Sequence, residues 1–373
     1  MKVLHVISSG GMYGAEAVIL NLSRTLKERG HSCTLGVFSN SANPNLQLHE
    51  SATREGIESH LIPCKGQIDW TVTASLRELA TRVGADVVHA HGYKADVYVY
   101  LALRGTGTAL VSTCHNWLKA GLLVSAYGVA DRLVLRRYAR VVAVSDEVKQ
   151  RLLKAGVREE KIRMVCNGID LRPFDHALPV LREELAANDC PIVGLIGRLS
   201  REKGVDIFLR AAARVLMEVP SARFVVVGEG PDRDKLELLI DALGIRKSVS
   251  MLGRRDDMPS VYASLGVMVS SSRQEGLPMA ILEGMASGLP LVASAVGDVP
   301  TVVLDGRTGL LTGAEDVDAL ARGIVRLLQD SARREQLGAA ARQLVEEKFS
   351  AERMTADYLR VYEEAIASGG KTR

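Results

Sequence analysis

Short apolar runs and amphipathic stretches alternate along the whole chain. Residues 3–7 form an apolar run of strand length, and residues 15–29 then repeat apolar positions with helical spacing. Alternation of this kind indicates an α/β protein whose parallel sheets carry helices on both faces. Five strands are expected in each half of the chain: residues 3–7, 33–38, 87–90, 109–112 and 141–144, and then residues 192–196, 223–227, 248–252, 267–270 and 290–293.

The two groups of strands predict two doubly wound, Rossmann-like domains. We assign residues 1–172 to the first domain and residues 188–350 to the second, because residues 171–190 carry two prolines, mixed charge and no clear strand. Two such domains facing each other would form a cleft lined by the carboxyl ends of both sheets. Doubly wound sheets bind their ligands at these ends.

The composition is that of a folded protein. With 373 residues, 47% of them hydrophobic, the chain is long enough for two or three domains with real cores. The longest apolar runs have strand length, so no transmembrane helix is expected. The first residues, MKVLHVISSG, predict a strand and a glycine turn rather than a signal peptide, which indicates a cytoplasmic protein. The five cysteines are widely spaced and form no CxxC motif, so we expect free thiols.

Positive charge is concentrated in the first half. The first 175 residues carry 22 Lys and Arg against 16 Asp and Glu, although the whole chain has a net charge of only +3. Residues 117–140 gather several of these cations, among them Lys119 and Arg132, between apolar positions. Two interpretations stay open: a helix in peripheral contact with an anionic membrane at its inner face, and a core helix with a solvated basic face, which we favour. No nucleic-acid partner is expected, because aromatic residues make up only 4% of the chain and do not interleave with the cations.

Two glutamates flank the start of one predicted helix in the run SSRQEGLPMAILEGMAS. Pro278 suits the first position of this helix, so Glu275 lies just before the helix and Glu283 inside it. The free N–H groups of Gly276 and Leu277 at the helix start favour a phosphate. A carboxylate at the same place is suited to accept hydrogen bonds from hydroxyls, so the expected ligand carries both phosphates and hydroxyl-rich rings. The alternative is that both glutamates only complement the helix dipole.

The longer run EGLPMAILEGMASGLPLVASAVGDVP resembles the E-x7-E signature of the retaining glycosyltransferases of family 4, which have the GT-B fold. In that family the first Glu, here Glu275, contacts hydroxyls of the transferred sugar, and the second, here Glu283, holds the nucleotide ribose. Gly297 and Asp298 stand where many relatives carry two glycines. The resemblance extends from the segment GGMYGAE near the start to the last helix, and it implies that residues 351–373 form a C-terminal helix crossing back to the first domain.

A glycine-rich segment, SSGGMYGAE, joins the first predicted strand to the first helix. Gly11 and Gly14 allow the backbone to approach a ligand closely and leave the helix start open to phosphate. The segment is not a GxGxxG fingerprint, so a nicotinamide cofactor is poorly supported. Together with the family resemblance, it places Gly11 and Gly14 at the diphosphate of the donor or on the acceptor side, with Glu16 as a weaker acceptor contact.

Three histidines lie at the ends of predicted strands. His89 and His91 would share one strand face, which could suggest a metal, but no third ligand is evident nearby and we predict no metal site. His89 is therefore interpreted as structural. His115 resembles the active-site histidine of the family, which lies near the reactive carbon of the sugar. His91 is its weaker neighbour, on the acceptor side.

Two cations flank a loop between a strand and a helix in the second half. Arg198 and Lys203 can converge on one diphosphate, while Gly204 frees the helix start. In the family these positions neutralise charge on the leaving nucleoside diphosphate; the alternative is a solvated basic loop. Further on, the sequence MLGR resembles the loop whose backbone reads the nucleobase, which assigns Gly253 and Arg254 to the donor site.

The resemblance implies a retaining hexosyltransferase that moves a sugar from a nucleoside diphosphate sugar to an acceptor hydroxyl. UDP-sugars are the first choice and GDP-sugars the second, in glycolipid or polysaccharide assembly, by a metal-independent front-face mechanism. No cofactor is expected besides the donor substrate, and the acceptor could be lipid-linked, a saccharide or a small molecule. Two other classes stay open: a sugar-nucleotide epimerase or phosphorylase of the same architecture, and a non-catalytic sugar-nucleotide binding protein.

Overall fold

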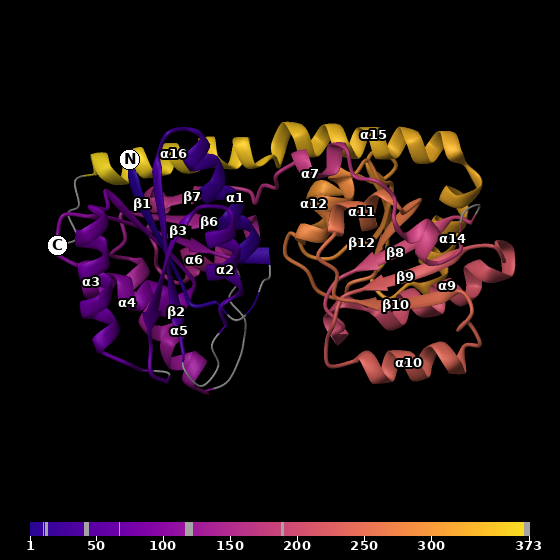
Figure 1. The fold of residues 1–373 in the computed structure, drawn as a ribbon, viewed down its shortest axis with the longest axis horizontal. Coiled ribbons are helices and arrows are strands. Elements are labelled where there is room, and N and C mark those ends of the chain that lie inside the picture. Colours follow the sequence, from indigo (N-terminus) through magenta and orange to yellow (C-terminus); the bar gives the residue numbers. More distant parts are fainter. Residues whose placement is uncertain are drawn as a thin grey trace. The chain divides into compact units, whose positions relative to one another are not determined.

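The chain divides into two compact units, which are described one at a time (Figure 1). The computed structural model describes residues 1–9, 11, 14–40, 45–66, 68–115, 122–187 and 190–368, with the side chains of residues 122–127 left out. The first unit comprises Met1–Gly168 and Ala351–Arg373, and the second comprises Ile169–Ser350. Lys119, at the start of the basic segment, lies outside the described residues.

The first unit is built on a seven-stranded parallel sheet with the strand order β3-β2-β1-β4-β5-β6-β7. The order reverses between β1 and β4, which is the switch point of a doubly wound sheet. Its strands are β1 (Lys2–Ile7), β2 (Ser32–Ser39), β3 (Glu58–Pro63), β4 (Val87–His91), β5 (Ala109–Cys114), β6 (Arg140–Ala143) and β7 (Ile162–Met164). Its helices are α1 (Gly14–Glu28), α2 (Gln47–Arg54), α3 (Thr71–Val83), α4 (Tyr93–Leu103), α5 (Leu122–Leu135), α6 (Asp146–Lys154), η1 (Glu159–Lys161) and α16 (Ala351–Ala367).

The second unit repeats this plan with a six-stranded parallel sheet in the order β10-β9-β8-β11-β12-β13. The order reverses between β8 and β11. Its strands are β8 (Ile192–Ile196), β9 (Arg223–Val227), β10 (Val249–Gly253), β11 (Val267–Ser270), β12 (Leu291–Ser294) and β13 (Gly309–Thr312). Its helices are α7 (Arg172–Asp175), α8 (Leu181–Glu184), η2 (Arg201–Lys203), α9 (Val205–Glu218), α10 (Arg233–Ala242), α11 (Met258–Ala263), α12 (Met279–Ala286), α13 (Val299–Val302), α14 (Val317–Gln329) and α15 (Ser331–Lys348).

Both faces of the second sheet are buried, as the unbroken apolar runs of its strands predict. Val193 and Leu195 of β8 face the core formed with α9 and α14, whereas Ile192 faces the core formed with α11 and α12. The second core also buries Leu181 and Ala187. Residues 171–190, which the sequence analysis interpreted as a linker, therefore contain two short helices that pack on the second unit.

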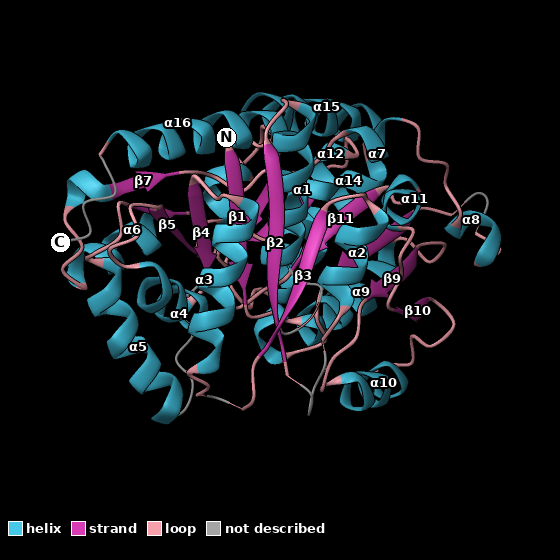
Figure 2. Ribbon diagram, turned by 60° about the vertical axis from the view of Figure 1, so that its left-hand side comes forward, coloured by secondary structure: helices cyan, strands magenta, loops and turns pink. Residues whose placement is uncertain are grey.

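The last helix, α16, packs on the sheet of the first unit (Figure 2). Its Tyr362 hydroxyl lies 2.8 Å from Nδ1 of His89, and its Tyr358 hydroxyl lies 3.0 Å from Oγ1 of Thr113. Arg140 donates a hydrogen bond of 2.9 Å to the Glu364 carboxylate. Two buried hydrogen bonds thus attach the end of the chain to β4 and β5, and a partly buried ion pair attaches it to β6. Within the described ranges, we find no helix with the length and apolar character needed to span a membrane.

Candidate active site

The switch point of the second sheet brings together two segments that are distant in the sequence. η2 follows β8, and the loop containing Glu275 follows β11. Because β8 and β11 are paired in parallel, with Leu195 opposite Val269, both segments leave the sheet at the same edge. This edge is where doubly wound sheets bind their ligands.

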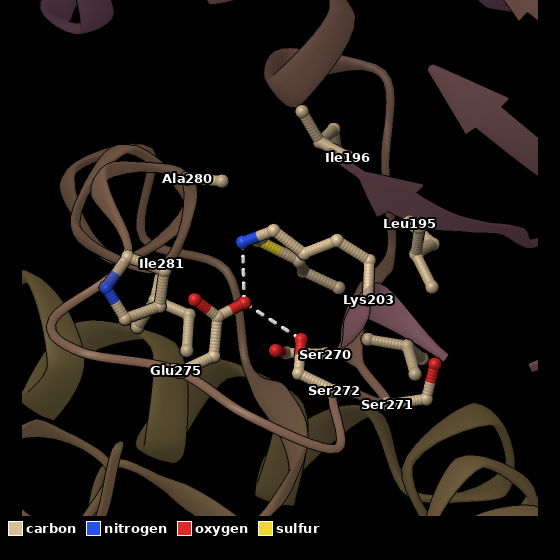
Figure 3. A pocket seen from close by; sticks show the side chains of 12 residues that line it. Leu195, Ile196, Lys203, Ser270, Ser271, Ser272, Glu275, Ala280 and Ile281 are labelled. Atoms are coloured by element: carbon tan, nitrogen blue, oxygen red, sulfur yellow. Dashed lines mark hydrogen bonds and ion pairs between the residues drawn. The ribbon is translucent and has the colours of Figure 1, made fainter. Parts of the chain in front are cut away.

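Lys203 and Glu275 form an ion pair at this edge (Figure 3). Lys203 Nζ contacts Oε1 of Glu275, and Oγ of Ser272 donates a second hydrogen bond of 2.7 Å to the same oxygen. The Glu275 side chain is only 9% exposed, whereas that of Lys203 is 29% exposed. Within the described part of the chain, Oε2 of Glu275 accepts no hydrogen bond, so one carboxylate oxygen remains available for a hydroxyl.

A pocket opens beside this ion pair. Glu275 and Lys203 both line it, together with the ends of β8 and β11 and the start of α12. Its lining residues are Leu195, Ile196, Lys203, Met268, Val269, Ser270, Ser271, Ser272, Glu275, Pro278, Ala280 and Ile281.

Arg273 anchors the loop that carries Glu275. Its guanidinium donates two hydrogen bonds of 2.8 Å to the carboxylate of Asp206 in the first turn of α9 and another to Glu315. The backbone N–H of Arg273 also donates to the Glu202 carbonyl at 2.7 Å. The hydrogen bonds from Arg273 hold the pKa of Asp206 below its ordinary value. The sequence analysis missed Arg273, although a single arginine between Ser272 and Glu275 was a visible signal.

Two glycines let the backbone of the same loop pass at close range. A Cβ added to Gly204, at φ +62°, would lie 2.0 Å from the carbonyl oxygen of Ser271. A Cβ added to Gly297, at φ +52°, would lie 1.7 Å from the carbonyl oxygen of Glu275. Only glycine combines this backbone conformation with these contacts. The positions of Lys203 and Glu275 therefore depend on both glycines.

Glu283 is held by a tyrosine that the sequence analysis also missed. The Tyr262 hydroxyl, from α11, donates a hydrogen bond of 2.7 Å to Oε2 of Glu283 in α12. Burial raises the pKa of Glu283, and the bond from Tyr262 partly offsets that rise. α12 begins at Met279, one residue later than predicted, because Pro278 keeps an extended ψ of 127° and is the N-cap rather than the first helical residue.

Replacing Tyr262 with phenylalanine should weaken nucleotide binding about threefold to tenfold if Glu283 accepts bonds from a ribose, since one hydrogen bond that orients the carboxylate is lost. The variant should also change the pH dependence. A ribose-binding Glu283 must be ionised, so affinity falls as the pH drops through its pKa. Loss of the Tyr262 bond raises that pKa further, and the loss of affinity then begins at higher pH.

Calorimetric titration with UDP between about pH 5 and pH 8 would measure both effects. Tyr358→Phe is the matched control, because it removes a buried tyrosine hydroxyl that bonds Thr113 in the other unit. Equal affinity and an equal pH profile in Tyr262→Phe and the unaltered protein would contradict the assignment of Glu283.

The remaining donor-site predictions lie at the same edge of the second sheet. The backbone N–H groups of Gly276 and Leu277 make no hydrogen bond within the described residues and precede α12. Arg198 follows β8 and is exposed; its backbone carbonyl accepts from the Ser200 N–H, and no hydrogen bond or ion pair joins its guanidinium to another described residue. Gly253 and Arg254 stand at the end of β10, two strands away from β8 in the sheet.

The first unit places His115 at the end of a row of three imidazoles. Nδ1 of His5, in β1, lies 2.9 Å from Nε2 of His91, at the end of β4. Nδ1 of His91 lies 3.1 Å from Nε2 of His115, which follows β5. Burial lowers the pKa of His5 to about 3 and that of His115 to about 4, and it lowers the pKa of His91 as well. All three rings are therefore neutral near pH 7.

His5 corrects the expectation that no third histidine lies near His89 and His91. Ligand nitrogens of these three residues lie within 4.8 Å of one another. The sequence analysis missed His5 because it lies 84 residues before His89 and meets it only through the pairing of β1 with β4. Both ring nitrogens of His89 already bond hydroxyls, those of Tyr362 and Thr113, so His89 has the structural role predicted for it.

The glycine-rich segment after β1 is described only in part. Gly10 lies outside the described residues, whereas Gly11 is buried and Gly14 begins α1. Ser9 Oγ lies 2.9 Å from both the Gly11 carbonyl and Oε1 of Glu16. Glu16 is 5% exposed in the first turn of α1. The donor and acceptor roles assigned to these residues remain predictions.

Comparison with protein families matches nearly the whole chain. Residues 12–172 match the model of Glycosyltransferase Family 4, and residues 180–344 match that of Glycosyl transferases group 1. Alpha-D-kanosaminyltransferase of Streptomyces kanamyceticus is 31% identical over 305 residues, 77% of this chain and 78% of that protein. N-acetyl-alpha-D-glucosaminyl L-malate synthase of Bacillus anthracis is 26% identical over 372 residues, 96% of this chain and 95% of that protein.

Solved structures confirm the predicted GT-B fold. HepE of Anabaena, in complex with UDP, matches 97% of this chain and all of its own with a TM-score of 0.84 and 22% identity. The same protein in complex with UDP-glucose gives a TM-score of 0.83 over 99% of this chain. At this identity the match shows the fold, with two Rossmann-like parallel-sheet units.

Proposed function

Because the chain belongs to the group 1 and family 4 glycosyltransferases, we propose that it transfers a sugar from a UDP-sugar to an acceptor hydroxyl with retention of the anomeric configuration. The observation that carries this proposal is the Lys203–Glu275 ion pair at the switch point of the second sheet. The pair places a cation that can bind a diphosphate next to a carboxylate. One oxygen of this carboxylate is available to accept a hydrogen bond from a sugar hydroxyl.

Each part of the proposed donor has a chemically matched partner in the second unit. Lys203 and the exposed Arg198 supply positive charge for the diphosphate. Glu275 accepts from hydroxyls of the sugar, and Glu283, oriented by Tyr262, accepts from the ribose. Gly253 and Arg254 are assigned to the base. Uridine is the first choice because HepE, a structural relative, was solved with UDP and with UDP-glucose.

The proposed reaction is a front-face displacement without a metal. The bond between the anomeric carbon and the phosphate oxygen breaks, and the acceptor oxygen forms its bond on the same face. The proton of the acceptor hydroxyl passes to the leaving phosphate. Lys203 and Arg198 stabilise the charge that develops on the diphosphate, which is the main source of rate acceleration in such a site. Lys203 and Ser272 engage Oε1 of Glu275, which supports a binding role for this carboxylate rather than attack on the sugar.

The proposed acceptor is a hydroxyl compound with an anionic group, in glycolipid or polysaccharide assembly or in small-molecule glycosylation. The excess of basic residues in the first 175 positions supports this class. The name of one relative, N-acetyl-alpha-D-glucosaminyl L-malate synthase, contains an acidic hydroxy compound. A lipid-linked phosphate, a charged saccharide and a hydroxy acid all have this chemistry.

A thermal-shift panel with UDP, GDP, ADP and their glucose conjugates tests the donor. A ligand at one hundred times its dissociation constant adds about 2.7 kcal/mol of stability. A shift with the uridine compounds alone supports the proposal.

The anomeric proton coupling of the product, measured by NMR, then tests retention of the anomeric configuration. Full activity in excess chelator tests metal independence. Conversion of the sugar without any acceptor would instead indicate an epimerase, and tight binding without transfer or hydrolysis a binding protein.

The exposed side of α5 supports peripheral membrane contact as part of this proposal. Val129 and Leu133, one helical turn apart, are 57% and 56% exposed, and Arg132 beside them is exposed as well. Sedimentation with vesicles should show binding to phosphatidylglycerol-containing membranes that weakens with salt. Replacing both Val129 and Leu133 with serine should reduce the bound fraction about tenfold. Equal sedimentation with and without anionic lipid would contradict the contact.

A further inference from the structure

The hydrogen bonds in the row His5, His91 and His115 fix a common direction. A neutral imidazole carries one N–H and one lone pair, on different nitrogens. Each ring–ring bond therefore needs an N–H on one side and a lone pair on the other. Because His91 bonds a ring at each nitrogen, 2.9 Å to His5 and 3.1 Å to His115, its tautomer dictates those of both neighbours.

Only two arrangements satisfy both bonds. In the first, Nδ1 carries the proton in all three rings, so His115 presents an N–H at Nδ1 and His5 has a lone pair at Nε2. In the second, Nε2 carries every proton, and His5 then has an N–H at Nε2. Both end atoms, Nε2 of His5 and Nδ1 of His115, are buried without a hydrogen-bond partner among the described residues.

The positions of the two ends distinguish these arrangements. His5 is 0% exposed in the middle of β1, where a ligand has no access. An unpaired N–H at this depth is rarer and more costly than an unpaired lone pair. His115 follows the carboxyl end of β5, the edge at which doubly wound sheets bind ligands, and the residue as a whole is partly exposed although its Nδ1 is buried. An N–H at this end can be paired when a ligand binds.

We propose that His5 and His91 are positioning residues that hold His115 in the Nδ1–H tautomer, so that His115 donates a hydrogen bond to an oxygen of the sugar nucleotide. The choice of ligand rests on the proposed function, whereas the tautomer does not. His115 is then a neutral donor that cannot act as the base toward the acceptor hydroxyl through Nδ1. The same requirement gives His5 a role at the site, although it is fully buried in β1.

The first test is the tautomer of His115 in the ligand-free protein. Nitrogen-15 NMR of histidine-labelled protein separates protonated from unprotonated ring nitrogens, and His115→Gln identifies the His115 signals by their loss. We expect protonated Nδ1 in His5, His91 and His115. An isolated histidine ring favours the Nε2–H form. Protonated Nδ1 in all three rings would therefore show that the hydrogen bonds between the rings set the tautomer. A proton at Nε2 of His115 would overturn the proposal.

The second test changes His5, which does not contact His115. In His5→Leu, the donor to Nε2 of His91 is lost, and the His115 signals should change to the Nε2–H form. Turnover should fall about threefold to tenfold, the effect of one hydrogen bond. His5→Asn keeps an N–H near the position of Nδ1 and should retain both the tautomer and the turnover. His89→Gln is the control, because it alters a neighbouring buried histidine outside the row.

A third test, in which ligands are added, distinguishes a failure of this inference from a failure of the proposed function. Addition of UDP should perturb the Nδ1 signal of His115 if a phosphate oxygen accepts its bond, and UDP-glucose alone should do so if a sugar oxygen accepts it. If thermal shifts show that neither compound binds, the donor assignment fails, while the tautomer result still stands. If UDP-glucose binds without any change at Nδ1 of His115, the proposed hydrogen bond is refuted. If His5→Leu does not fold, the ligand-free tautomer and His5→Asn still decide the role of the row.

Discussion

Replacing Lys203 with alanine should lower the turnover number about 100-fold to 1,000-fold, which is the effect of removing one preorganised group that stabilises developing charge. The Michaelis constant for the donor should change much less, because the diphosphate gains most of its charge as the sugar departs. Ser272 would still hold Glu275 in the variant, so the loop should keep its conformation. Steady-state kinetics with a saturating acceptor measure both constants.

Arg201→Ala is the matched control for this experiment. Arg201 lies in the same short helix η2 and is exposed. Among the described residues, its hydrogen bonds run through its backbone carbonyl, which accepts from the Arg273 guanidinium and from the Gly204 N–H. Its removal should leave turnover within about twofold of the unaltered protein, as for an exposed side chain that makes no hydrogen bond to another described residue. If Lys203→Ala kept the full turnover number, Lys203 would have no role in stabilising the leaving group.

Replacing Gly297 with alanine should destabilise the protein by about 2–5 kcal/mol and abolish most of its activity. The new Cβ would lie 1.7 Å from the carbonyl oxygen of Glu275, and the residue would also keep an unfavourable φ of +52°. Relief of the clash requires movement of the loop, and with it the carboxylate that Lys203 holds. Urea unfolding monitored by circular dichroism, together with donor turnover, measures both effects.

Gly244→Ala separates the clash from the backbone strain. Gly244 has a similar φ of +69° at the end of α10, but an added Cβ would meet nothing within 4 Å. This control should cost about 1–2 kcal/mol and leave turnover unchanged. Equal losses of stability and activity in the two variants would mean that the close approach to Glu275 does not matter.

Strong local patterns made most of the fold predictable. The predicted strands at residues 192–196 and 223–227 coincide with β8 and β9, because both are central and buried on both faces. The sequence analysis missed β3, β7 and β13, which are the edge strands at three ends of the two sheets. An edge strand is partly exposed, so polar residues interrupt its pattern: β3 reads ESHLIP, and β7 has only three residues. Residues 40–70, for which no strand was predicted, contain α2 and β3.

Residues of the site could be predicted where the motif lies within one segment of the sequence. Contacts between residues from distant segments could not be predicted. Glu275, Glu283 and Lys203 were each recognised from their own neighbours in the sequence. The ion pair between Lys203 and Glu275 spans 72 positions, and the bond from Tyr262 to Glu283 spans 21. His5 reaches His91 across 86 positions. Such partners depend on strand pairing and helix packing, which periodicity within one segment does not specify.

The attachment of α16 to the first unit has a consequence for how the protein is made. On the ribosome, Ala351–Ala367 emerges only after the second unit, whose synthesis takes roughly 10–40 s at ~5–20 residues per second. Until then His89 and Thr113 lack their tyrosine partners, and the part of the sheet that α16 later covers is exposed. The second unit, although later in the chain, can therefore complete its folding first. During this delay the nascent first unit presents an apolar surface to which chaperones can bind.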